Sequence, residues 1–169
     1  MPLTTRRRLI LITRIVLIAG ALLWMARIYM YSSEVASLSD GRSSRTALKI
    51  SAVIAEINHM TEEEEERFAN DIEGFIRKCA HMYLYAVLAA LLYGVFLTYA
   101  VKNARSACSS LLISILYAAS DEIHQLFVPG RSGQFKDVII DTGGAVIGLC
   151  AALTVYFVIK KIKSLLEKS

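Results

Sequence analysis

The sequence predicts an all-α membrane protein: a four-transmembrane-helix bundle, with two short amphipathic helices in the loop between spans 1 and 2. The composition is 55% hydrophobic and the mean hydropathy is +0.48. Apolar residues occur in runs long enough to cross a bilayer, which takes about 20 residues. Only two prolines occur in 169 residues, so long helices are permitted. This length suits one membrane domain covering residues 1–169.

Four apolar runs are the predicted spans, and they cover about residues 9–30, 79–101, 106–127 and 138–159. Short basic clusters flank the runs before residue 9, between residues 101 and 106, and after residue 159. Because cytoplasmic flanks are enriched in Lys and Arg, this alternation predicts a multi-pass cell-membrane protein with both termini in the cytoplasm. A few bases fall on the outward side instead: Arg77, Lys78, Arg131 and Lys136. We interpret them as parts of a site rather than as topology signals.

The extracytoplasmic loop, residues 31–76, is the longest polar segment. Its beginning is rich in serine, which is typical of a loop. Residues 46–57 and then 61–76 show apolar residues at helical spacing, and Thr61-x-x-Glu64 has the form of a capping box. We therefore expect two short amphipathic helices that lie on the membrane or cap the bundle.

Ionisable residues gather where the third and fourth spans meet, in the stretch SDEIHQLFVPGRSGQFKDVIIDTGGAVIG from Ser120 to Gly148. A charge at the middle of a membrane helix costs about 2.5–3.5 kcal/mol on insertion scales, and less near the interface. The concentration of such residues predicts either a functional site or a polar lock between helices. Pro129-Gly130 predicts a tight outward turn that returns the fourth span beside the third.

The predicted topology brings the polar ends of all four spans to one outward-facing side. Residues three or four apart share a helix face, so Arg77, His81 and Tyr85 form one stripe. By the same spacing, Asp121 stacks with His124 and Gln125, and Asp137 stacks with Asp141. Gly144-x3-Gly148 continues that last stripe and permits close helix contact. We therefore expect both aspartates to face the bundle, above its tightest crossing.

Ordered motifs across about residues 10–158 resemble the VanZ-like membrane protein family. They are Asp121-Glu122-x-His124-Gln125, Pro129-Gly130-Arg131, Asp137-x3-Asp141-x2-Gly144-x3-Gly148, Arg77-Lys78-x-Ala80-His81-x3-Tyr85 and, more weakly, Ser32-Ser33-Glu34. The chain departs from the family at Glu34, where Gln is usual, and at Leu84, where many members carry an acid. The resemblance implies a cell-envelope membrane protein; the founding member is linked to low-level resistance to the glycopeptide teicoplanin. It implies no defined reaction.

Three interpretations of the charges stay open, and the first is structural. In it, Arg77, Lys78 and Arg131 neutralise the four acids of the third and fourth spans. Some pairing of this kind is required because unpaired buried charges are costly.

The second interpretation is a membrane-embedded hydrolase or transferase acting on a phosphate-containing envelope lipid. A carboxylate beside a histidine supplies a general base, so the candidate catalytic residues are His81, Asp121, Glu122 and His124. The histidines and acids could also bind a metal, but they lack metal-site spacing and no metal ligand is predicted. The sequence identifies no cofactor and does not decide whether the protein is an enzyme.

The third interpretation is a module that binds or transfers an anionic lipid or a lipid-linked envelope precursor at an outward-facing polar cavity. The candidate substrate-binding residues are Arg77, Lys78, Tyr85, Gln125, Arg131, Asp137 and Asp141. Arginine gives bidentate contacts to phosphate. No interleaving of bases and aromatics indicates a nucleic-acid partner. The oligomeric state is undetermined. We adopt binding as the main hypothesis, with an influence on teicoplanin susceptibility implied by the resemblance.

Overall fold

The computed structural model describes residues 3–34 and 36–167, which fold as helices and connecting turns without a strand. The helices are α1 (Leu3–Ser32), α2 (Ala36–Asn58), α3 (Glu62–Thr98), α4 (Asn103–Gln125) and α5 (Phe135–Leu166). The predicted all-α class is confirmed. Each predicted span coincides with most of one helix: α1, α3, α4 and α5 in chain order.

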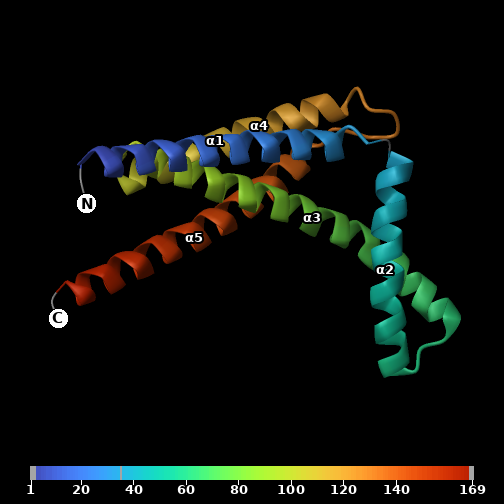
Figure 1. Ribbon diagram of the computed structural model, residues 1–169. Coiled ribbons are helices and arrows are strands. Elements are labelled where there is room, and N and C mark those ends of the chain that lie inside the picture. Colours follow the sequence, from blue (N-terminus) through green and yellow to red (C-terminus); the bar gives the residue numbers. More distant parts are fainter. Residues whose placement is uncertain (1–2, 35, 168–169) are drawn as a thin grey trace.

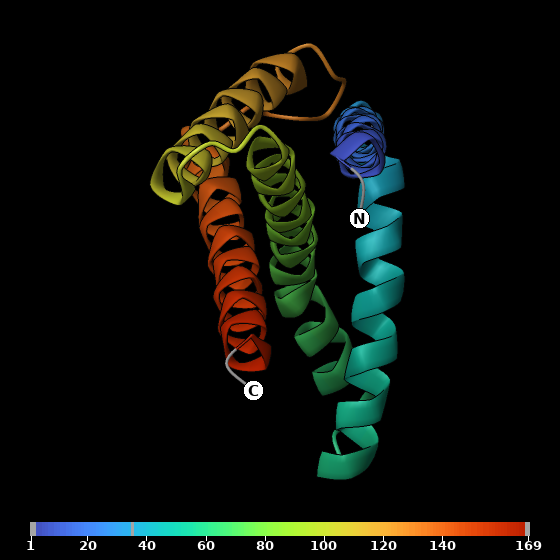
Figure 2. The same ribbon diagram turned by 60° about the vertical axis from the view of Figure 1, so that its left-hand side comes forward.

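Helices α1, α3, α4 and α5 alternate in direction along the bundle, as Figures 1 and 2 show. Both described chain ends and the α3–α4 turn lie at one end of the bundle, at the left of Figure 1. The α4–α5 loop and α2 lie at the opposite end, where α2 runs crosswise to α1. The motif residues near residues 32, 77–85, 121–125 and 131–141 are therefore brought to a common end.

The central helix is α3, which packs against each of the other four helices. Its first part lies along α2, and its second part lies between α1, α4 and α5 (Figure 1). The second part supplies much of the buried core, including Tyr85, Leu88 and Ala89, each fully buried. The polar end and the core are thus connected through one continuous helix.

The segment between the first two predicted spans differs from the prediction. Helix α2 begins at Ala36, in the serine-rich part expected to be loop, and residues 61–76 form the start of α3 rather than a separate helix. Small residues, Ala47 and Ser51, are buried in α2, which packs against α3. This tertiary packing outweighs the weak helix propensity of serine. No proline separates residues 61–76 from the following span, so the helix continues.

The predicted capping box at the start of α3 is confirmed. The Thr61 amide donates to the Glu64 carboxylate at 2.8 Å, and the Glu64 amide donates to Thr61 Oγ1 at 3.4 Å. The bond from the Thr61 amide lowers the pKa of Glu64, because it stabilises the ionised form. His59, with φ of 54°, closes α2 in a left-handed conformation, and Met60 N–H bonds Ala55 O at 3.0 Å. A short, defined turn therefore folds α2 back onto α3.

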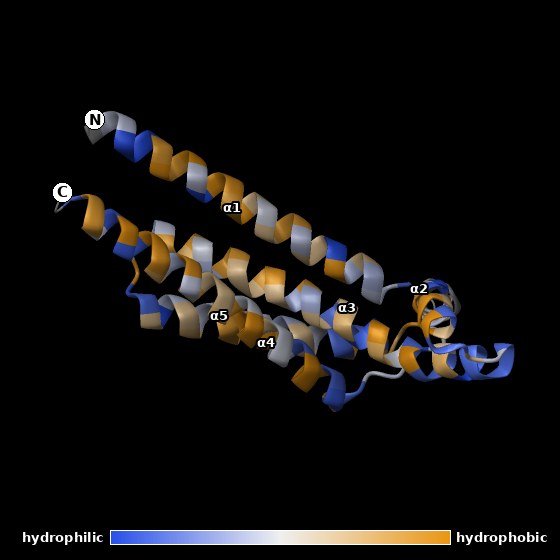
Figure 3. Cartoon of the chain, turned by 90° about the horizontal axis from the view of Figure 1, so that it is seen from below, coloured by the Kyte–Doolittle hydropathy of each residue, from blue (hydrophilic) through white to orange (hydrophobic). Residues whose placement is uncertain are grey.

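Three helices among the described residues are long and apolar enough to cross a membrane: Thr4–Ser32, Glu62–Thr98 and Phe135–Leu166. Figure 3 shows that the middles of these helices are largely apolar and that the first turns of α3, at the right of the picture, are polar. Helix α4 is not among them; besides the acids Asp121 and Glu122 near its end, it carries a row of serines: Ser106, Ser110 and Ser114. These serines are buried, whereas Leu112 and Leu116 of α4 are exposed.

Helices α3 and α5 approach at backbone distance through two glycines, as the small-x3-small pattern predicted. A Cβ at Gly144 would lie 2.6 Å from Met82 Cα, and one at Gly148 would lie 2.5 Å from Ala86 Cα. Neither site can hold a side chain without moving the main chain of α3. Asp141, one turn before Gly144, is consequently held at the same interface with 1% exposure.

Gly144→Ala should lower the free energy of unfolding by about 1–3 kcal/mol, because the added methyl group must displace α3. The matched control is Gly143→Ala, where a Cβ meets nothing within 4 Å. It should be neutral or raise stability by up to about 1 kcal/mol through helix propensity. Denaturant titration in detergent, followed by circular dichroism, measures both variants. Equal stability of the two variants would contradict the backbone contact.

Candidate functional site

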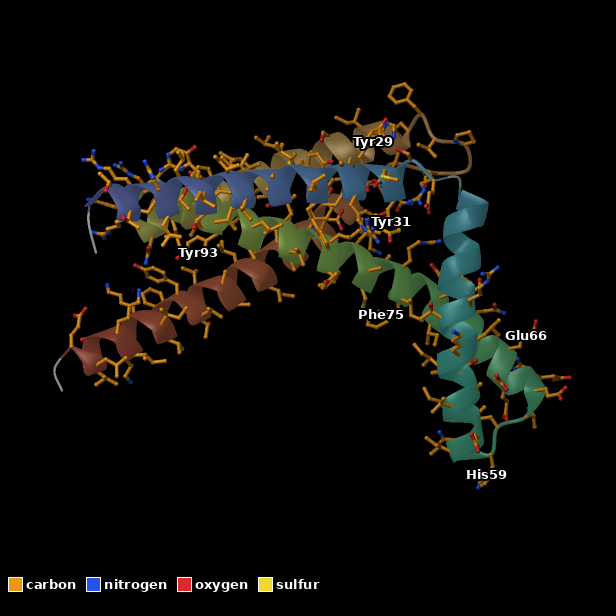
Figure 4. The ribbon with its side chains drawn as sticks, viewed as in Figure 1. Tyr29, Tyr31, His59, Glu66, Phe75 and Tyr93 are labelled. Carbon is orange, nitrogen blue, oxygen red and sulfur yellow. The ribbon has the colours of Figure 1, made fainter. Side chains whose placement is uncertain are left out.

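A polar cavity of about 320 Å³ opens at the end of the bundle where α4 ends and α5 begins. It is enclosed by α3, α4, α5 and the loop of residues 126–134. Its lining residues are Arg77, Lys78, His81, Glu122, Gln125, Gly130, Arg131, Ser132, Gln134, Asp137, Ile140 and Asp141. Tyr31, labelled in Figure 4, marks this end of α1. The convergence expected from sequence is thus observed for most of the predicted site residues.

Two buried acids, Asp121 and Glu122, lie near the end of α4, and Glu122 lines the cavity. Asp121 Oδ2 accepts a hydrogen bond from Ser32 Oγ at 2.6 Å. Glu122 accepts hydrogen bonds from Gln125 Nε2 at 3.1 Å and from the main-chain N–H of Gln134 at 2.9 Å. Neutral donors therefore stabilise both carboxylates. The two acids are neighbours in sequence and point to different sides, with Asp121 toward α1 and Glu122 toward the loop.

The loop closing the cavity is held by Arg131. Its Nε donates to the main-chain carbonyl of Glu34 at 3.0 Å, and its Nη2 donates to that of Tyr31 at 3.2 Å. The carbonyls at a helix C-terminus carry partial negative charge, so a guanidinium is well suited to them. Arg131 follows Gly130, whose φ of 77° forms the predicted Pro129-Gly130 turn. This turn aims the arginine back at α1.

The deepest acid is Asp141, on α5 opposite His81 of α3. The His81 Nδ1 and Asp141 Oδ1 atoms are 3.9 Å apart, and the side chains are 17% and 1% exposed. Neither carboxylate oxygen of Asp141 has a hydrogen-bond partner among the described residues. Buried carboxylates normally accept hydrogen bonds. Asp141 therefore lines the polar cavity with two acceptor atoms that no described residue satisfies.

A second cavity, of about 550 Å³, adjoins the first between α1, α2 and α3. It is lined by Trp24, Arg27, Tyr31, Glu34, Ser43, Thr46, Ile76, Arg77, Ala80, His81, Tyr83, Leu84 and Arg131. Most of its wall is apolar or aromatic. Arg77, His81 and Arg131 line both cavities. A polar chamber and an apolar one therefore meet at a shared wall of two arginines and a histidine.

Both cavities lie within the part of the chain that matches a known family. Residues 17–158 match the VanZ/LLP1 family. The chain belongs to the VanZ family. No curated protein and no solved structure matches it. The family and the three apolar helices identify a membrane protein.

Three of the predicted site residues in this VanZ family protein do not line the polar cavity: Tyr85, Asp121 and His124. Asp121 lies behind Glu122, as described above. His124 lies against α1, where its Nε2 is 3.0 Å from Ser33 Oγ and its ring stacks on Tyr29 at 4.6 Å. Tyr85 is fully buried one helical turn below His81, and its hydroxyl has no hydrogen-bond partner among the described residues.

Sequence reasoning missed the residues that complete the site. Ser132 and Gln134 of the loop line the polar cavity, and Trp24 and Tyr83 line the apolar one. The loop residues lie inside the charged stretch, so their position was a usable signal. Trp24 and Tyr83 lie in apolar runs, where nothing in the sequence marks them as site residues. Within the described residues, no three His, Cys, Asp or Glu side chains are grouped to hold a metal ion.

Ser32→Ala should lower the free energy of unfolding by about 1–3 kcal/mol, because Asp121 would keep only the 3.5 Å contact from Gln125. Ser120→Ala is the matched control, since that exposed hydroxyl bonds the Tyr117 carbonyl within its own helix. Unfolding in detergent compares the two. If the Ser32 variant is as stable as the control, the bond to Asp121 contributes nothing.

Proposed function

We propose that this VanZ family protein binds the anionic head group of a cell-envelope lipid, or of a lipid-linked precursor, in the polar cavity, with hydrocarbon in the adjoining apolar cavity. The observation that carries the proposal is the shared wall of Arg77, His81 and Arg131. An amphiphile needs adjacent polar and apolar compartments. A phosphate at their junction would face two guanidinium groups, which bind phosphate strongly.

The hydrogen bonds around the acids support an anionic ligand. Asp121 and Glu122 line or back the same cavity, and both receive short hydrogen bonds from neutral donors. The two carboxylates are therefore stabilised in part by neutral donors, and not only by the cationic side chains of the cavity wall. Lys78 adds a further positive charge to the cavity wall.

The proposed membrane arrangement has four spans: α1, α3 and α5, together with α4, which is the third span in chain order. Its buried serine face and exposed Leu112 and Leu116 support this, because a helix in lipid turns apolar side chains outward. The positive-inside rule puts both termini in the cytoplasm and the cavity outside. Helix α2, crosswise to α1 at that end, then lies along the outer surface (Figure 1).

Cysteine labelling tests this arrangement in a variant whose native cysteines, Cys79, Cys108 and Cys150, are replaced by alanine. Ser132→Cys should react with a membrane-impermeant maleimide in intact cells, because Ser132 is exposed at the proposed outer end. Lys102→Cys, exposed at the opposite end, should react only after permeabilisation. The reverse pattern would show that the protein has the opposite orientation. Reaction of both cysteines in intact cells would show that α4 does not cross the membrane.

Arg77→Ala should lower lipid retention at least about tenfold, since one charge-assisted hydrogen bond is worth about that factor. Native mass spectrometry of protein purified in mild detergent measures the retained lipid. Arg67→Ala is the matched control: the same helix carries this arginine, its side chain is 78% exposed, and it lines neither cavity. Equal lipid retention by the two variants would refute the proposed binding site.

A hydrolase or transferase is the second candidate, favoured by the position of His81 beside Asp141 in the cavity wall. In such a reaction His81 would accept the proton of the attacking water or hydroxyl group. The retained lipid distinguishes the candidates, because only an enzyme changes its chemical species. We include an influence on susceptibility to glycopeptides such as teicoplanin, which rests on the family alone.

A further inference from the structure

The unpartnered carboxylate of Asp141 restricts what kind of head group fits the polar cavity. Asp141 is 1% exposed and lines that cavity, yet neither of its oxygens has a hydrogen-bond partner among the described residues. The other two buried acids, Asp121 and Glu122, accept hydrogen bonds of 2.6 and 2.9 Å. Asp141 is therefore the buried acid of the cavity lining whose acceptor atoms no described residue satisfies.

Nearby protein groups do not supply the missing donor. His81 Nδ1 is 3.9 Å from Asp141 Oδ1, which is too long for a hydrogen bond. Gly144, one turn later, packs against the main chain of α3 at Met82, which fixes the backbone of α5 close to Asp141. A buried acceptor without a donor is costly. The hydroxyl of Tyr85, also buried without a hydrogen-bond partner among the described residues, does not donate to Asp141, so a donor from the cavity is left to satisfy it.

We propose that Asp141 receives an N–H or O–H donor of the bound head group. The ligand is then a phosphate-bearing amphiphile whose head group also carries an ammonium or a hydroxyl. This deepens the proposed function and rests on it. Arg77, Lys78 and Arg131 contact the phosphate, while Asp141, from α5, selects the group attached to it. A carboxylate is a strong acceptor, so a donor facing it strengthens binding and a methyl group there leaves it unsatisfied.

A three-lipid competition tests the inference on the whole protein in mild detergent. The probes are phosphatidylethanolamine, phosphatidylglycerol and phosphatidylethanol with identical acyl chains. All three are phosphodiesters; the first carries an ammonium, the second hydroxyls and the third only a terminal methyl group. Native mass spectrometry of an equimolar mixture gives the retained ratio. We expect at least one donor-bearing lipid to exceed phosphatidylethanol about tenfold, as one hydrogen bond to a charged group predicts.

Asp141→Asn should reduce that preference several-fold, because the amide is a weaker, neutral acceptor. Asp141→Ser, a smaller replacement, gives a second measurement should the first variant purify poorly. Asp71→Asn is the control, because it makes the same change at an exposed aspartate of α3 that lines neither cavity. It should keep the preference. A ratio between lipids is independent of how much protein folds.

The outcomes separate the two proposals. Retention of all three lipids in equal amounts, lost in Arg77→Ala, overturns the role of Asp141 and leaves the binding site standing. An unchanged preference in both Asp141 variants also overturns it. Retention of none of the three, or retention insensitive to Arg77→Ala, argues against the proposed function itself. Preference for phosphatidylethanolamine alone supports an ammonium donor, and preference for phosphatidylglycerol alone supports a hydroxyl.

Discussion

The backbone contact between α3 and α5 is the constraint on which the rest of the structure depends. Gly144 and Gly148 bring α5 against Met82 and Ala86, where a side chain would collide with α3. Toward the cavity, this contact brings Asp141, one turn before Gly144 in α5, close to His81, the residue before Met82 in α3. A small-residue interface, which in lipid supplies packing, thus also sets the distance between two ionisable groups.

The distribution of polarity in α4 agrees with its proposed place in lipid. In water, Ser106, Ser110 and Asp121 would be expected on the surface and Leu112 and Leu116 inside; in α4 the reverse is found. Lipid offers no hydrogen bonds, so polar side chains gather between helices and find partners there. Ser110 and Ser114 donate to carbonyls one turn earlier, at 2.7 and 2.9 Å. Helix α4 is consequently polar on its packed face and apolar on its exposed one.

Sequence periodicity predicted the helices and the shared faces, but not the neighbour that each face meets. Asp121 and His124 share a face, as their spacing indicates, and that face meets Ser32 at the end of α1 and Ser33 just after it instead of the cavity. Which side of α4 faces α1 depends on how the helices pack, and the helical period carries no such information. Similarly, the start of α2 at Ala36 depends on packing against α3, which overrides the local loop signal of its serines.

The cavity is preorganised because its covering loop is tied at two points from different helices. Arg131 binds the carbonyls of Tyr31 and Glu34 at the end of α1, and the Gln134 amide binds Glu122 of α4. Gly133, between these points, approaches the Glu122 carbonyl too closely for a side chain. A loop fixed in this way loses little entropy when a ligand binds. The same arginine that holds the loop also lines both cavities, so the anchoring of the loop and the proposed binding of an anion involve one guanidinium group.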